Sequence, residues 1–195
     1  MIKVGITGGI GVGKTYVCNI LEKMGYSIFS SDQVSKKIVS ENTFVRDKIR
    51  KFFGEDIIEN EKISREKLAV QVFSNKEKLK KLNEIVHPFV KKEFDNWISN
   101  RYDEKLVFKE AAILFEANSH KNLDYVVCVT AKLQDRINRV MQRDKVDSDS
   151  VEKRISMQMS QIEKEKLADF IIFNSNDDLV LPQIINALKK IFELE

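Results

Sequence analysis

The residues with the clearest chemical potential lie close to the amino terminus. Residues 8–15 read G-G-I-G-V-G-K-T and follow a short apolar run. They match the pattern G-x-x-x-x-G-K-[ST], the P-loop, in its usual place after a buried strand and before a helix. Glycines let the backbone curl around a phosphate chain, so that successive N–H groups face the anion. The pattern predicts that Lys14 reaches the β- and γ-phosphates and that the Thr15 hydroxyl holds Mg²⁺.

The P-loop therefore predicts a site for a nucleoside triphosphate. The helix expected over about 14–23 presents its positive N-terminus to the same phosphates. The glycine spacing does not fit G-x-G-x-x-G, which argues against a dinucleotide-binding fold. The expected nucleotide-binding residues are Gly8, Gly9, Gly11, Val12, Gly13, Lys14, Thr15 and Tyr16.

Asp32 stands just past the second apolar run, in the sequence S-S-D at 30–32. A carboxylate there could accept the proton of an alcohol and orient its oxygen for in-line attack on a phosphoryl group. The same three residues also suit the N-cap of a helix that starts at residue 33. The spacing alone leaves both roles open.

Arg136, Arg139 and Arg143 occupy neighbouring turns of one expected helix. Guanidinium groups at this spacing could hold the charge that spreads over the oxygens of a phosphoryl group in transfer. The alternative is a solvated face opposite an apolar stripe. That stripe consists of Leu133, Ile137, Val140 and Met141. Because the chain also carries a P-loop, we favour the phosphate clamp.

Three more residues are candidates for binding an acceptor. Glu110 follows the third apolar run, where it could hold Mg²⁺ through water, help to place the acceptor, or be an ordinary charge at a strand end. Glu116 is a further candidate of the same kind. An isolated histidine on a helix edge is more often structural than catalytic, and for His87 contact with the acceptor is the functional role we expect.

Five short apolar runs are expected to form the strands that position these residues. They lie at 3–7, 27–30, 106–109, 125–130 and 170–174. Most are continuous rather than alternating, as in strands that are buried on both faces of a parallel sheet. Helical stretches lie between them. The sequence thus predicts an α/β fold, a five-stranded parallel sheet flanked by helices, with ligands at the carboxyl ends of the strands.

Two long segments of helical pattern interrupt this alternation. Segment 33–101 is expected to be an insertion that binds the acceptor, and segment 131–167 a mobile lid that excludes water. The nucleotide-binding core then comprises 1–32, 102–130 and 168–195. In the first insertion, Ser74 and Glu77 form an expected capping box, and His87-Pro88 is expected to end or kink the helix that follows.

Composition narrows the classes of partner. The 195 residues are 43% hydrophobic and 32% charged, with a net charge of +3, which suits a soluble globular chain. No apolar run reaches the length of a membrane span. The lysine clusters at 48–51 and 78–81 lack interleaved aromatics, so we expect neither nucleic acid nor membrane as a partner.

Cys18 and Cys128 are expected to be reduced thiols in a cytoplasmic protein. The sequence fixes no oligomeric state, and we assume a monomer.

Taken together, these segments resemble the dephospho-CoA kinase family. Residues 4–15 are similar to the family's V-G-L-T-G-G-I-G-S-G-K-S, 86–88 to L-H-P, and 112–116 to P-L-L-F-E. Residues 139–144 are similar to the lid's R-x-x-x-R-D, 154–158 to an R-x-x-x-Q stretch in the lid region, and 168–174 to A-D-x-V-I-x-N. The segments follow the family's order over nearly the whole chain. Departures include Val12 for Ser, Glu110 for Asp and Ala112 for Pro.

The resemblance implies an enzyme that transfers the γ-phosphoryl group of MgATP to the ribose 3′-hydroxyl of dephospho-CoA, the last step of coenzyme A synthesis. It implies that Asp32 is the base, because Ser31-Asp32 sits where the family carries D-A-D. It also implies that Lys14, Arg139 and Arg143 stabilise the transferring group. His87 falls in the acceptor-binding insertion, and Asn174 falls near the nucleotide.

Two rival functions stay open at this point. A kinase for another small acceptor, such as a nucleoside monophosphate, would share the P-loop, the helical insertion and the arginine lid, and only the resemblance argues against it. A nucleotide switch of the GTPase type would need a guanine-reading N-K-x-D. Its sole approximation is N-K-E-K at 75–78, which lacks the aspartate, and no D-x-x-G occurs.

Overall fold

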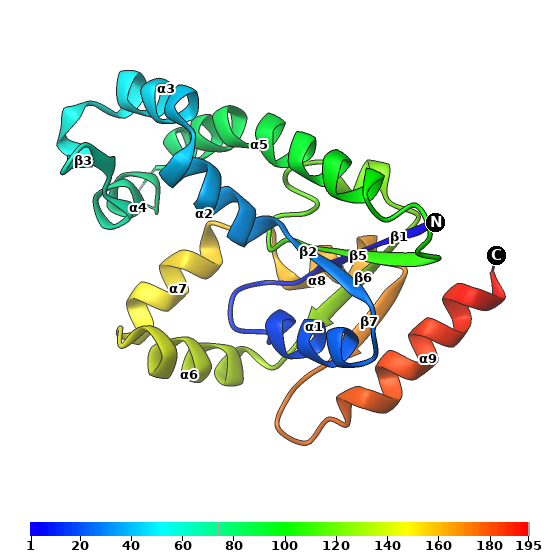
Figure 1. Ribbon diagram of the computed structural model, residues 1–195. Helices are drawn as coiled ribbons and strands as arrows, with labels where there is room; N and C mark the ends of the chain where they lie inside the picture. Colours follow the sequence, from blue (N-terminus) through cyan, green and yellow to red (C-terminus); the bar gives the residue numbers. More distant parts are fainter. Residues whose placement is uncertain (74, 195) are drawn as a thin grey trace. The chain divides into compact units, whose positions relative to one another are not determined.

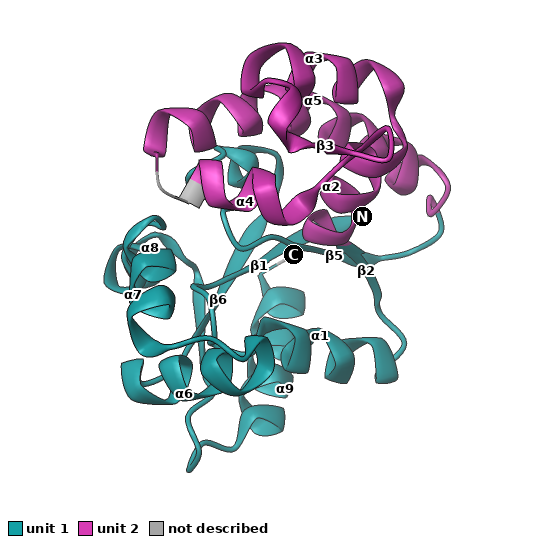
Figure 2. Cartoon of the chain, turned by 90° about the vertical axis from the view of Figure 1, so that its left-hand side faces the viewer, with its two compact units in different colours: residues 1–29, 103–195 teal, residues 30–102 magenta. Residues whose placement is uncertain are grey.

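A computed structural model describes residues 1–73 and 75–194, which fall into two compact units (Figure 2). Unit 1 comprises residues 1–29 and 103–195, and unit 2 comprises residues 30–102. The predicted insertion, 33–101, falls within unit 2, and the predicted lid, 131–167, is part of unit 1. Ser74, predicted to open a helix, lies outside the described residues.

Unit 1 is built on a five-stranded sheet with the strand order β2-β5-β1-β6-β7 (Figure 1). Its strands are β1 (Ile2–Thr7), β2 (Ser27–Ser30), β5 (Leu106–Glu110), β6 (Tyr125–Thr130) and β7 (Phe170–Phe173). The pairs β1–β5, β1–β6 and β6–β7 are parallel. The predicted parallel sheet is confirmed, and each strand begins and ends within one residue of its predicted limits.

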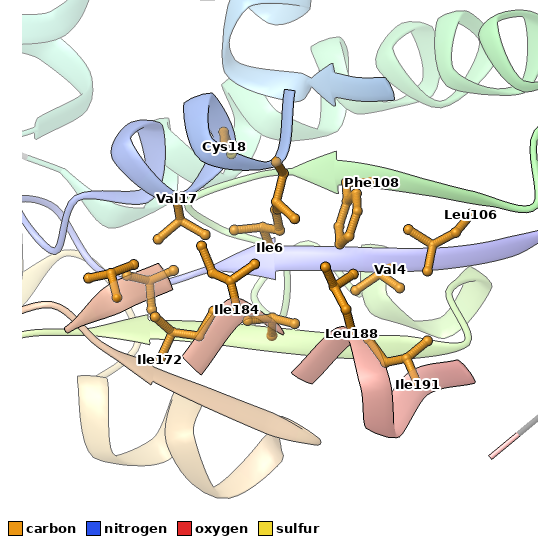
Figure 3. Close-up of a cluster of buried hydrophobic side chains, with 14 of the residues drawn as sticks. Val4, Ile6, Val17, Cys18, Leu106, Phe108, Ile172, Ile184, Leu188 and Ile191 are labelled. Carbon is orange, nitrogen blue, oxygen red and sulfur yellow. The ribbon is translucent and has the colours of Figure 1, made fainter. Parts of the chain in front are cut away.

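Helices cover this sheet because their apolar residues recur at helical spacing. The helices of unit 1 are α1 (Lys14–Lys23), α6 (Leu133–Asp144), α7 (Ser148–Ser156), α8 (Gln161–Leu167) and α9 (Val180–Glu193), with a 3₁₀ helix, η2 (Ser119–Asn122). Figure 3 shows Ile184, Leu188 and Ile191 of α9 facing the strands, in one cluster with Val17 and Cys18 of α1. This cluster is the main core of unit 1.

A second, smaller cluster of unit 1 includes Val126 of β6, Leu114 and Phe115. Val127 and Val129, by contrast, belong to the main cluster, so successive residues of β6 bury their side chains in different clusters. Burial on both faces explains why this strand reads as a continuous apolar run.

The register of the sheet brings the strand ends together at one edge. Ile6 pairs with Glu110 at the end of β5, and Thr130, the last residue of β6, pairs with Phe173, the last of β7. The segments that follow β1, β5, β6 and β7 therefore start at the same edge. One of these segments is the P-loop.

The described residues of unit 2 form four helices and a small hairpin. They are α2 (Ser31–Glu41), α3 (Thr43–Phe53), α4 (Arg65–Phe73) and α5 (Lys76–Ser99), with a 3₁₀ helix η1 (Glu55–Ile57) and the strands β3 (Ile58–Glu59) and β4 (Lys62–Ile63). The prediction that this segment is entirely helical is wrong at the hairpin. Its turn, Asn60-Glu61, adopts φ of +48° and +61°, a left-handed conformation that the helical pattern did not reveal.

Helix α5 runs unbroken through Pro88, so of the two predicted effects of His87-Pro88 the helix end is wrong, and the kink stays a prediction. Pro88 removes one backbone hydrogen bond. On either side of it, however, Val86, Val90 and Phe94 recur at helical spacing and are buried, which keeps the helix packed. Asn75 caps the N-terminus, and its side chain accepts hydrogen bonds from the next turn. In the described residues, no helix is long and apolar enough to cross a membrane.

Candidate active site

Glycines fix the shape of the P-loop. Gly11 and Gly13 have φ of +81° and +89°, in the left-handed region. A Cβ at Gly11 would lie 2.5 Å from the carbonyl oxygen of Arg136, and a Cβ at Gly13 would collide with Nδ2 of Asn174. Both positions therefore need glycine for backbone conformation and for space. Gly13 is also the residue from which α1 begins.

The turn into α1 leaves a set of backbone donors free. Among the described residues, the N–H groups of Gly11, Gly13, Lys14 and Thr15 have no hydrogen-bond acceptor. The N–H of Tyr16, by contrast, donates to the carbonyl of Gly13 at 3.0 Å. Free N–H groups at the positive end of a helix form a nest for an anion, so this part of the loop fits a polyphosphate.

The side chains of the first turn of α1 supply the groups that a magnesium-bound phosphate needs. Lys14 bends back over the loop, and its Nζ donates to the carbonyl of Gly8 at 3.0 Å. The side chain of Thr15 is exposed and next to Lys14. Burial raises the pKa of the Cys18 thiol to about 12, and the nearby negative charge of Glu110 adds to this effect. Glu110 itself is buried at the end of β5. The Glu110 carboxylate is therefore close enough to Cys18 of α1 to act on its charge. A hydroxyl and a carboxylate are oxygen donors of the kind that Mg²⁺ takes.

Asn174 anchors the second half of the loop. It follows β7 and is buried, and its Nδ2 donates to the carbonyl of Val12 at 2.8 Å. Its own N–H donates to the carbonyl of Thr130 at 2.8 Å. Asn174 thus ties the ends of β6 and β7 to the P-loop, next to Gly13.

Arg139 of α6 points an unpaired donor toward this region. Its Nη1 is buried and has no hydrogen-bond partner among the described residues. The same atom lies 3.8 Å from the position that a Cβ of Gly13 would take. A buried guanidinium nitrogen without a partner is costly, and a bound anion would satisfy it. This arrangement fits a phosphate at the loop.

The prediction that the arginines of α6 lie on the face opposite its apolar residues is wrong for Arg136. Arg136 is buried together with Ile137 and Val140, because residues 136 and 140 are one helical turn apart and share a face. Its Nε donates to the carbonyl of Ile10 at 3.0 Å, so the side chain braces the P-loop. Burial lowers the pKa of Arg136 from its usual value.

Arg143, the third arginine of α6, is exposed and paired with its neighbour. Its Nε and Nη2 donate to the carboxylate of Asp144 at 2.7 and 3.1 Å. Arg154 of α7 donates to the same carboxylate at 2.7 Å. These contacts lower the pKa of Asp144, the bond from Arg143 most of all. Asp144 thus holds two arginines of the predicted lid together.

Two glutamines of the predicted lid contact the P-loop directly. Oε1 of Gln161 accepts a hydrogen bond from the N–H of Gly9 at 3.0 Å, and Oε1 of Gln158 accepts one from the N–H of Ile10 at 2.9 Å. In the sequence, Gln158 stood out only as the last residue of the stretch similar to R-x-x-x-Q at 154–158. Gln161 was not a candidate. Both contacts join positions about 150 residues apart, a relation that local spacing does not reveal.

Comparison with known proteins decides the family. A family model described as dephospho-CoA kinase matches residues 2–179. The chain belongs to the dephospho-CoA kinase family. A relative from Bacteroides fragilis (strain YCH46), named dephospho-CoA kinase, is 34% identical over 192 residues and covers 98% of this chain and 94% of its own.

Two solved structures are similar to this chain over almost its whole length. The crystal structure of TT1252 from Thermus thermophilus has a TM-score of 0.83 and 31% identity, covering 98% of this chain and 96% of that one. The dephospho-CoA kinase from Campylobacter jejuni has a TM-score of 0.68 and 28% identity, covering 97% and 96%. The predicted P-loop kinase fold and the predicted family are both confirmed.

The remaining candidate residues of this family member differ in what surrounds them. Glu116 is bonded within unit 1: its Oε1 accepts from Nζ of Lys164 at 2.8 Å and from the N–H of Met159 at 3.0 Å. Lys164 is fully buried and also donates to the carbonyl of Ala112 at 2.5 Å. Burial lowers the pKa of Lys164, and Glu116 opposes that shift. These bonds give Glu116 a structural partner, and its contact with an acceptor stays a prediction.

Asp32 and His87 both belong to unit 2. Asp32 is half-buried in the first turn of α2, whose N-cap is Ser30. The alternative of Asp32 as an N-cap is therefore wrong, and its predicted role as a base stays open. His87 is half-buried on α5, beside the buried Val86. Its contact with an acceptor stays a prediction.

Proposed function

We propose that this protein is an ATP-dependent kinase that phosphorylates the ribose 3′-hydroxyl of dephospho-CoA and releases coenzyme A and ADP. The observation that carries the proposal is the family match over residues 2–179, which includes a P-loop whose donors fit a polyphosphate. In the reaction, the hydroxyl oxygen forms a bond to the γ-phosphorus, the bond from that phosphorus to the bridging oxygen of ADP breaks, and the hydroxyl proton passes to a base.

The nucleotide would be held by unit 1. The N–H groups of the P-loop bind the phosphates, and Lys14 neutralises the β- and γ-phosphates. Thr15 would hold Mg²⁺, and Glu110 would either bind that ion through water or contact the acceptor. Mg²⁺ supplies charge that offsets the negative charge of the phosphate oxygens. Asn174 keeps the loop in place beside the nucleotide.

The acceptor would be activated by Asp32 and bound by the insertion over 33–101. Asp32 accepts the proton of the 3′-hydroxyl and orients its oxygen. His87, Glu110 and Glu116 are the further residues that we propose for contact with the acceptor. The acceptor itself is a small molecule, and neither nucleic acid nor membrane takes part.

The lid over 131–167 would complete the site. Arg139 and Arg143 stabilise the charge on the transferring phosphoryl group, and the lid closes only when both substrates are bound. Closure limits transfer of the phosphoryl group to water. Both cysteines are free thiols, which supports the proposed cytoplasmic location. We propose that the working unit is a monomer.

The test is a panel of acceptors assayed by coupled release of ADP from MgATP. The panel contains dephospho-CoA, nucleoside monophosphates and water alone. We expect fast release with dephospho-CoA and only slow release with the others. Equal or faster release with a nucleoside monophosphate would overturn the choice of acceptor. Tight GTP binding without any acceptor-dependent turnover would instead favour a nucleotide switch.

A further inference from the structure

We propose that Gln158 and Gln161 are positioning residues for the phosphate donor. Their side-chain amides fix the first turn of the P-loop, residues 9 and 10. The second turn, residues 11–15, is thereby preorganised to bind the nucleotide. The inference rests on the proposed function only in naming ATP as the donor.

The donors of the P-loop fall into two groups. The N–H groups of Gly9 and Ile10 are already bonded, to Gln161 at 3.0 Å and to Gln158 at 2.9 Å. From Gly11 to Thr15, the N–H of Val12 donates weakly to the carbonyl of Gly9 at 3.4 Å, and the others have no acceptor in the described residues. The glutamines thus use the donors of the first turn and leave those of the second turn to a ligand.

Ile10 is held on both sides of its peptide unit. Its N–H is bonded to Gln158, and its carbonyl accepts from Nε of Arg136 at 3.0 Å. The guanidinium of Arg136 also lies against Gly9, where a Cβ would be 2.5 Å from its Nη2. The first turn is therefore enclosed by two side-chain amides and one guanidinium.

The elements that carry the glutamines are themselves fixed. Gln161 opens α8, which begins with a capping box between Ser160 and Glu163. Its Nε2 donates to the carbonyl of Val129 at 3.1 Å, so the same side chain joins β6 to the P-loop. The N–H of Gln158 donates to the carbonyl of Ile155 at the end of α7. A side chain with fixed neighbours loses little freedom when it holds the loop, which favours a positioning role.

A neutral amide suits this task because it accepts a hydrogen bond without bringing negative charge toward the phosphates. Methionine has a similar shape but lacks the strong acceptor. A Gln→Met change therefore removes the bond to the loop and keeps the bulk of the side chain. At position 161 it also removes the bond to the carbonyl of Val129, which ties the glutamine itself to β6. Loss of one such bond should weaken nucleotide binding about 5- to 10-fold.

The experiment compares Gln158→Met and Gln161→Met with the control Gln134→Met. Gln134 is an exposed residue of α6, and within the described part of the chain its amide bonds only Asn138, one helical turn away. Calorimetric titration with MgADP gives the dissociation constant, and steady-state assays give the KM of ATP and of dephospho-CoA. We expect weaker MgADP binding and a higher KM for ATP in both test variants, with an unchanged KM for dephospho-CoA. The control should match wild type.

MgADP affinity within twofold of wild type in both test variants would overturn the inference. A rise in the KM of dephospho-CoA equal to that of ATP would do so too, because a general loss of structure would then explain the result. If a methionine variant does not fold, asparagine at the same position tests the same bond, since it is one methylene shorter. Failure of wild type to phosphorylate dephospho-CoA would overturn the proposed function alone, because MgADP binding tests the glutamines without an acceptor.

Discussion

Asn174 and Val12 are 162 positions apart, and the Nδ2 of Asn174 donates to the carbonyl of Val12 at 2.8 Å in a buried position. Asn174→Ala would leave that carbonyl unpaired, which should lower the free energy of unfolding by about 1–3 kcal/mol. It should also weaken MgADP binding, because the second turn of the P-loop loses its support. Chemical denaturation and calorimetric titration measure the two effects.

The exposed Asn138 of α6 supplies the control for this prediction. Asn138→Ala removes the same chemical group from the surface, with one exposed bond to Gln134. It should change the free energy of unfolding by less than about 0.5 kcal/mol and leave MgADP binding unchanged. If Asn174→Ala binds MgADP as tightly as wild type, Asn174 does not support the nucleotide site.

Gly13 and Gly25 offer a matched pair for testing the P-loop. Both have positive φ, +89° and +93°, so alanine at either position strains the backbone by about 1–2 kcal/mol. A Cβ at Gly13 collides with Asn174, whereas a Cβ at Gly25 meets nothing within 4 Å. We expect Gly13→Ala to abolish ATP binding and Gly25→Ala to lower only the melting temperature. Equal ATP binding by the two folded variants would contradict the geometry of the loop.

Asp32→Asn tests the proposed base. Asparagine keeps the size of the side chain but cannot accept the proton of the acceptor, so kcat should fall about 10²- to 10⁴-fold while the KM of ATP stays the same. Asp95→Asn, at an exposed position of α5, changes the net charge equally and should retain full activity. Rapid-quench measurement of a single turnover reports the chemical step. Undiminished transfer by Asp32→Asn would remove Asp32 as the base.

The ion pair between Lys164 and Glu116 allows a test of whether Glu116 stabilises the fold. Lys164→Met would leave the Glu116 carboxylate and the carbonyl of Ala112 without their buried donor and should lower the free energy of unfolding by about 1–3 kcal/mol. The double variant Lys164→Met/Glu116→Gln should lose less than the sum of the single changes. Urea denaturation of the four proteins completes the cycle.

The same variants test whether Glu116 contacts the acceptor. If it does, Glu116→Gln raises the KM of dephospho-CoA, whereas a purely structural role changes the stability and leaves that KM unchanged. A KM that rises together with normal stability would show that the carboxylate faces the substrate and that the bond to Lys164 is secondary.

Local patterns predicted the parts of the fold that local forces decide. The mainly continuous apolar runs predicted the five strands of the large sheet, because strands buried on both faces, such as β1, β5 and β6, carry few polar residues. The limits of α1 followed from its position directly after Gly13. The P-loop could be recognised because a phosphate nest requires glycines and a lysine at fixed spacing.

Tertiary contacts decided the rest. The hairpin β3–β4 depends on a two-residue turn, Asn60-Glu61, in which Asn60 alone is a typical turn residue and no glycine follows, so the turn signal was weak. α5 continues past Pro88 because its buried face outweighs one lost bond. Arg136, Gln158 and Gln161 reach the P-loop from distant segments, so their role became visible only when the chain was folded.

The most direct test of phosphoryl transfer is mass spectrometry of the acceptor after incubation with MgATP and dephospho-CoA. We predict a product heavier by one phosphoryl group, with fragmentation placing that group on the 3′-oxygen of the ribose, and no product from Lys14→Ala. Unchanged dephospho-CoA beside wild-type protein that binds MgATP, or a phosphoryl group on another oxygen, would contradict the proposed reaction.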